Sequence, residues 1–108
     1  MAQDFENSVA RDTGTSGATI REANSDDAIV GLRLANITSG AIVVDCFIER
    51  SSANYFLVKG ATIPAGSSLE LIDGGSKIVL VSGDALKVDT DTASSLDVWC
   101  SVVDTISE

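Results

Sequence analysis

From Ala28 onward, hydrophobic and polar residues alternate along the chain, and turn residues interrupt the alternation at intervals of about ten positions. The alternation is clearest in residues 42–48, where every second side chain is aliphatic or a cysteine. This pattern predicts strands with one buried face, and short strands separated by turns are typical of an antiparallel sandwich or barrel. The predicted strands are residues 28–37, 42–50, 55–63, 69–72, 78–81, 86–89 and 96–106.

Turn residues separate these strands. We expect hairpin connections at Thr38-Ser39-Gly40 and at Asp73-Gly74-Gly75-Ser76, and chain reversals at Ile63-Pro64-Ala65-Gly66 and Ser82-Gly83-Asp84. Glycine accepts the positive φ of tight turns, and proline is tolerated where its missing N–H has no partner to bond. The sequence therefore predicts an all-β fold, a single antiparallel β-sandwich of the jelly-roll-like or Ig-like kind.

The first 24 residues differ in composition from the rest. They are rich in Asp, Glu, Ser, Thr and Gly, and their main apolar side chains are Phe5, Val9 and Ile20. A segment with so little apolar surface cannot form a core of its own. We expect an extended N-terminal arm over residues 1–24 and a β-sandwich domain over residues 25–108. Within the arm, Phe5 and Val9 could form one turn of helix, and residues 19–22 could form a short strand.

Composition and charge exclude several classes of function. The 108 residues are 44% hydrophobic, which favours one compact domain over a disordered chain. Seven basic residues stand against sixteen acidic ones, and the resulting charge of −9 repels phosphate backbones and anionic lipid headgroups. The absence of histidine excludes the Ser-His-Asp triad, the Cys-His dyad and His-ligated zinc. We expect no binding to nucleic acid or membranes, and, because the N-terminus lacks an export signal, synthesis in the cytoplasm.

The residues with reactive or ligating side chains give no catalytic, metal or cofactor site. Cys46 and Cys100 both fall on predicted inward faces and could pair across the core, although folding in the cytoplasm favours two reduced thiols. Carboxylates at Asp26-Asp27, Asp73 and Asp89-Thr90-Asp91 could hold a cation or serve as an acid and base pair. Their spacing matches no complete loop motif, and turn carboxylates commonly bond their own backbone. No nucleophile elbow, phosphate loop or cofactor fingerprint accompanies them, so we expect a protein that is not an enzyme.

The positions of the large apolar side chains suggest a binding surface. Several aromatic residues fall on faces opposite the aliphatic stripes, where the other sheet, the N-terminal arm or a partner subunit would cover them. The predicted partner-binding residues are Phe5, Val9, Ile20, Phe47, Tyr55 and Trp99.

Several strand and turn patterns after Ala28 are shared with a known family. They are Ile29–Asn36, Val43-Val44-Asp45, Ile63–Leu69, Lys77–Leu80, Ser82-Gly83-Asp84 and Ser94–Val98. In these stretches the chain resembles the small virion structural proteins of tailed phages that infect cyanobacteria and other marine bacteria. The resemblance implies a non-enzymatic component of the particle, and it carries over no functional residue.

Three hypotheses of function follow from the patterns and the resemblance. In the first, the chain is a capsid decoration or cement protein, or a neck or tail accessory component of the virion. It would dock on a major capsid, neck or tail protein through its N-terminal arm and an apolar sheet face, as a homo-oligomer. In the second, it is a carbohydrate- or receptor-binding module of a tail fibre, with Trp99, Tyr55 and the acidic turns as contacts. In the third, it is a regulatory or anti-defence protein of the host cytoplasm.

Overall fold

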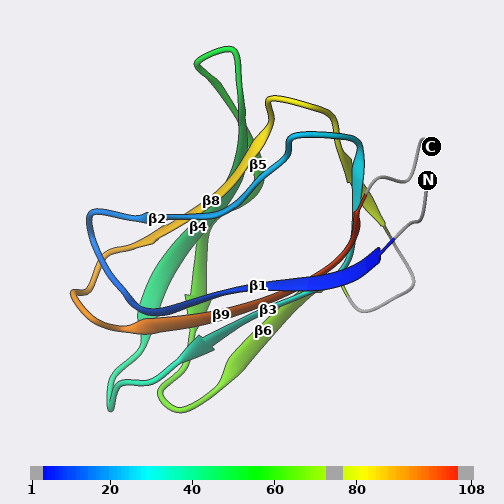
Figure 1. The fold of residues 1–108 in the computed structure, drawn as a ribbon. Coiled ribbons are helices and arrows are strands. Elements are labelled where there is room, and N and C mark those ends of the chain that lie inside the picture. Colours follow the sequence, from blue (N-terminus) through cyan, green and yellow to red (C-terminus); the bar gives the residue numbers. More distant parts are fainter. Residues whose placement is uncertain (1–3, 73–76, 105–108) are drawn as a thin grey trace.

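The computed structural model describes residues 4–72 and 77–104 and, within these ranges, contains nine strands and no helix (Figure 1). All strand pairings are antiparallel, and they form two sheets. Sheet A has the order β1-β9-β3-β6, with β7 also paired to β3, and sheet B has the order β2-β8-β4-β5. The strands are β1 (Asp4–Thr13), β2 (Ala18–Glu22), β3 (Asp27–Asn36), β4 (Ile42–Arg50), β5 (Ala53–Ile63), β6 (Ser68–Ile72), β7 (Ile78–Leu80), β8 (Ala85–Thr90) and β9 (Leu96–Asp104). The predicted all-β sandwich is confirmed.

The core lies between the two sheets and is almost entirely aliphatic. The predicted inward faces are confirmed in both sheets, since Val44 and Cys46 of β4 and Val98 and Cys100 of β9 are buried. The buried cluster contains Ile, Leu, Val, Ala and Cys but no aromatic residue among the described ones. The aromatic rings therefore contribute nothing to the centre of the fold, and several of them face outward.

The N-terminal residues are part of the sandwich. β1 pairs with β9 at the edge of sheet A, and β2 pairs with β8 at the edge of sheet B. This differs from the expected arm and from the division at residue 24, and the expected helical turn at Phe5 and Val9 is wrong, because both residues lie in β1. Composition misled the prediction because an edge strand is held mainly by backbone hydrogen bonds and needs few apolar side chains.

Most connections pass from one sheet to the other, so the predicted hairpin at Thr38-Ser39-Gly40 is wrong. β3 lies in sheet A and β4 in sheet B, and consecutive strands change sheets at every connection except β4–β5 and β6–β7. Residues 73–76 lie outside the described residues, but the strands that flank them both pair with β3 and do not form the expected hairpin with each other. The short β4–β5 hairpin turns at Ser51 and Ser52, which both have positive φ.

Asn36 joins two of the connections that cross between the sheets. The residue is buried, and its side-chain amide donates to the carbonyl oxygens of Gly40, Ile63 and Pro64 at 2.8, 2.9 and 3.1 Å. Its side-chain oxygen accepts from the backbone N–H of Thr38 at 2.9 Å. The turn after β3 and the turn after β5 are thus held together at one end of the sandwich.

Candidate functional site

The outward face of sheet A, called here the outer face, carries three of the predicted partner-binding residues. Phe5, Val9 and Trp99 are 85%, 55% and 56% exposed. Val9 lies directly opposite Trp99 in the β1–β9 register, and Phe5 lies opposite Val103. The alternation of β9 explains this placement, because the residues on either side of Trp99 point into the core. The structure therefore places Phe5, Val9 and Trp99 on the same face of sheet A, with Val9 beside Trp99 and with Phe5 further along β1, beyond Asn7.

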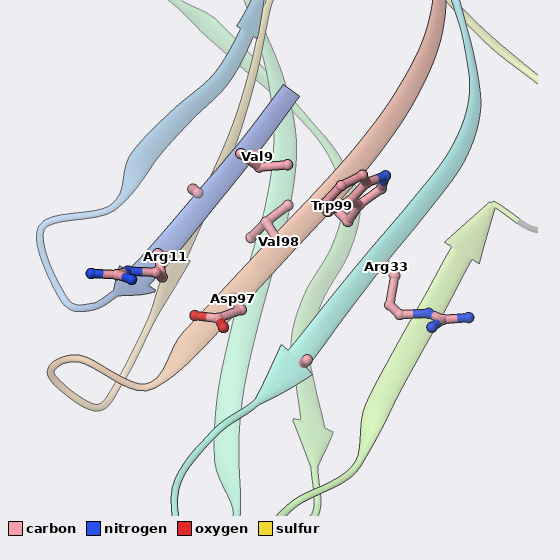
Figure 2. A pocket seen from close by; sticks show the side chains of 8 residues that line it. Val9, Arg11, Arg33, Asp97, Val98 and Trp99 are labelled. Atoms are coloured by element: carbon pink, nitrogen blue, oxygen red, sulfur yellow. The ribbon is translucent and has the colours of Figure 1, made fainter. Parts of the chain in front are cut away.

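A hollow of about 400 Å³ lies beside Trp99 on this face. Figure 2 shows Trp99 and Val9 on neighbouring strands, with Asp97 and Arg11 further along the same strands and Arg33 on β3. A second hollow of about 360 Å³ lies beside Trp99 toward Gly31 and Ser101. Because small residues flank the indole on β3 and β9, Trp99 stands between two recesses of the outer face.

Charged side chains surround the apolar centre of the outer face. Arg33 forms an ion pair with Glu70 at 3.1 Å, and both side chains are at least half exposed. Asp97 accepts a hydrogen bond from the backbone N–H of Asp12 at 3.1 Å, where the chain adopts a positive φ of 55°. Arg11 is exposed and has no ion pair with any residue that the structure describes. The rim of the hollow therefore offers a guanidinium group to an acidic partner group.

The other predicted partner-binding residues lie elsewhere. Phe47 and Tyr55 belong to β4 and β5 of sheet B, and Tyr55 is 59% exposed. Phe47 packs against Phe56 with ring centroids 5.1 Å apart, and Lys59 lies over the Phe56 ring at 4.5 Å. Ile20 is buried in the core and offers no surface to a partner. The six residues are thus divided between two sheets and the interior.

Four residues on these two surfaces were not among the predicted partner-binding residues: Arg11, Arg33, Asp97 and Phe56. Phe56 was detectable in principle, since it lies opposite Phe47 in the β4–β5 pair and both strands were predicted. The three charged residues carry no sequence signal, because charged residues are ordinary at outward positions of a strand.

Several of the acidic residues considered as metal or acid–base sites make contacts that hold the fold together. Asp27 is fully buried, and its carboxylate accepts from Nε of Arg21 at 3.0 Å. Arg21 also pairs with Glu6 at 3.0 Å and with Asp104 at 3.5 Å, so one guanidinium joins β2 of sheet B to three strands of sheet A. Among the described residues, no group of three or more side chains is placed to hold a metal ion, and Asp73 lies outside them.

Two further aspartates also have structural roles. Asp89 lies opposite Asp45 on the β4–β8 pair. The pKa of Asp89 is raised, mainly because the carboxyl group is partly buried and also because Asp45 repels its charged form. Asp91 accepts a hydrogen bond from the backbone N–H of Val43, and this bond lowers the pKa of Asp91. Asp89 therefore lies beside a like charge, whereas Asp91 fixes the turn after β8 to the start of β4.

Cys46 and Cys100 are free thiols that pack in the core. Cys46 lies in sheet B and Cys100 in sheet A, and neither side chain is exposed. Burial raises the pKa of Cys46 to about 12 and that of Cys100 to about 11, so both thiols are neutral at physiological pH. They act as small apolar side chains.

The comparisons with known proteins add no relative. No model of a known family matches the chain, and neither curated proteins nor solved structures gave a significant match. None of the described residues forms a helix long and apolar enough to cross a membrane.

Proposed function

We propose that the chain is a non-enzymatic structural component of a phage virion, a capsid decoration or cement protein or a neck or tail accessory, which docks through the outer face of sheet A. The observation that carries this proposal is the exposure of Phe5, Val9 and Trp99, three large apolar side chains that are each more than half exposed on one face of sheet A. Exposed apolar side chains do not stabilise an isolated monomer, whereas they contribute binding energy when a partner covers them.

The composition of the outer face suits a protein partner. Tryptophan and arginine are the residue types most often found at the energetic centre of protein interfaces, and Trp99 lies beside Arg11 and Arg33. The hollows on either side of the indole can receive side chains of a major capsid, neck or tail protein. A net charge of −9 opposes non-specific association between copies, and the chain would assemble in several copies on the particle through complementary surfaces.

The route of docking differs from the expected one. Because β1 is paired with β9, it does not drape over a neighbour as an arm but adds Phe5 and Val9 to the outer face. Attachment would therefore depend on the side chains of a folded surface.

Attachment to particles tests this proposal. Recombinant chain is mixed with particles of the encoding phage that lack it, and the chain that sediments with the particles is quantified. Trp99→Ala is expected to reduce loading at least about tenfold, as loss of an interface tryptophan does. Tyr55→Ala is the matched control, since Tyr55 is equally exposed but lies on sheet B. Absence of the chain from particles, or equal loading of Trp99→Ala and wild type, would refute the proposal.

A second candidate is a carbohydrate-binding module of a tail fibre. It is favoured by Trp99, an exposed indole on a β-sheet face with Asp97 and two arginines around the adjoining hollow. An indole face offers a flat apolar surface for a sugar ring, and a few polar groups around it can fix the orientation of the ligand. Tyr55 would not take part, because it lies on the other sheet. Binding to a glycan array that is lost in Trp99→Ala and kept in Tyr55→Ala would favour this candidate over docking to the particle.

A further inference from the structure

The two sheets have four edges, and three of them carry features that prevent pairing with another chain. Proteins protect edge strands by keeping them short, by bulges, by lysine or proline and by inward-pointing charged residues. β6 and β7, which together form one edge of sheet A, have five and three residues. In sheet B, β2 has five residues and a register shift, and β5 has register irregularities, Lys59 and a positive φ at Gly60.

The fourth edge, β1, is long and regular over most of its length, and its inward-facing charged residue, Glu6, is paired with Arg21 of β2 at 3.0 Å. The strand has ten residues and contains neither lysine nor proline. Its pairing with β9 is regular from Asp4 to Ala10, and the first irregularity lies between Ala10 and Thr13. In the described part of the chain, no strand pairs with the other side of β1 (Figure 1). A regular edge of seven residues that no described strand pairs with is a template for another strand.

We propose that this edge pairs antiparallel with β1 of a second copy, around a two-fold axis at Asn7, so that two copies of sheet A form one continuous sheet. The sequence of β1 is complementary to itself in this register. Each acidic position faces an uncharged one, with position 4 opposite Ala10 and Glu6 opposite Ser8 of the second copy. An axis at Ser8 would instead place two acidic positions, 4 and 12, opposite each other, which is unfavourable.

The apolar side chains support the same register. With the axis at Asn7, Phe5 lies opposite Val9 of the second copy on the outer face. Within each copy, Val9 is opposite Trp99 and Phe5 is opposite Val103. The pairing therefore creates a row of four apolar side chains across the joined sheet, in the order Trp99, Val9, Phe5 of the second copy and Val103 of the second copy. Phe5, the most exposed of the large hydrophobic side chains described, gains an apolar neighbour.

The pairing adds an interface to the proposed function and does not depend on it, since the free chain would dimerise in solution. Two copies of a chain with a charge of −9 repel each other, and this repulsion is screened at physiological ionic strength, where the Debye length is about 8 Å. The dimer is therefore expected to tighten as salt is raised. It would present two Trp99 side chains on one surface and so double the contacts available to a particle.

Sedimentation velocity over a concentration series tests for the dimer. Wild type is expected to change reversibly from monomer to dimer, and Phe5→Lys to raise the dissociation constant at least about tenfold, because each interface contains the changed residue twice. Val79→Lys is the control: Val79 is half exposed on β7 of the same sheet, away from β1, and the substitution changes the net charge equally. A wild type that stays monomeric, or a dimer that Phe5→Lys leaves intact, would overturn the proposal and leave docking to the particle unaffected.

Cysteine cross-linking tests the register. Directly opposed residues on antiparallel strands have Cα atoms about 4.5–5.5 Å apart, within the range of a disulfide, so Asn7→Cys is expected to form a covalent dimer under mild oxidation. Val9 lies four positions from its own counterpart in this register, about 14 Å along the strand, so Val9→Cys is expected to stay monomeric. The native thiols are buried and do not compete. Cross-linking of Val9→Cys but not Asn7→Cys would contradict the axis at Asn7.

Discussion

Replacement of Asn36 by alanine tests how strongly its side chain holds together the turns after β3 and β5, which connect the two sheets. The substitution removes an amide that donates to three carbonyl oxygens and accepts from the backbone N–H and the hydroxyl of Thr38. Two hydrogens serve three acceptors, so the amide makes about four hydrogen bonds at once. Each hydrogen bond contributes about 1 kcal/mol net, and a buried carbonyl that loses its donor costs about 1–3 kcal/mol. Water can reach some of the freed groups, so we expect a total loss of about 3 kcal/mol.

Such a loss is a large fraction of the 5–15 kcal/mol by which domains are usually stable, yet it leaves the variant folded. Urea unfolding followed by far-ultraviolet circular dichroism is expected to show a lower midpoint with an unchanged slope. Asn54→Ala is the matched control, because Asn54 is exposed in the β5 strand, and its loss is expected to stay within about 0.5 kcal/mol. If Asn36→Ala lowered the free energy of unfolding by less than about 1 kcal/mol, the Asn36 amide would not be what holds the turns after β3 and β5 together.

Three further predictions concern ionisation, thiol chemistry and turn geometry. The hydrogen bonds from Arg50 hold the pKa of Asp84 below its ordinary 3.8, so Asp84 stabilises the fold at neutral pH and loses this effect as pH falls through its lowered pKa. Asp84→Asn should thus be less stable than wild type at pH 7, with the gap in melting temperature closing in strong acid. Cys46 and Cys100 are expected to resist a thiol reagent in the native protein and to react fully in denaturant, and rapid labelling of the native protein would contradict their burial. Ser52 has φ of 68°, so Ser52→Gly should stabilise the β4–β5 hairpin by roughly 0.5 kcal/mol in urea unfolding, and a destabilised variant would argue against this turn.

Strict alternation made the strands predictable where one face is buried and the other exposed. The strand 42–50 was predicted with its observed bounds, because a slip of one residue would move its whole apolar set to the wrong face. The same reasoning failed for residues 4–13, where an edge strand has too few apolar residues to show a period. It also failed for the turn after β3, because the residues of a turn do not reveal whether the next strand joins the same sheet or the opposite one.

The candidate site could be predicted only as separate residues. Trp99 was predicted from its outward position on a strand, and Phe5 and Val9 as apolar residues of the expected arm, and all three are exposed. Their assembly into one surface depends on the pairing of β1 with β9, two strands from opposite ends of the chain. No local pattern encodes that pairing, and for the same reason neither the hollow beside Trp99 nor Arg11 at its rim could be predicted.

Electron microscopy of purified virions tests the proposed place of the chain in a phage particle most directly. We predict density for the sandwich at symmetry-related positions, with the outer face of sheet A against another virion protein and Trp99 inside that contact. Particles without the chain, or a docked chain whose outer face points into solvent, would contradict the account.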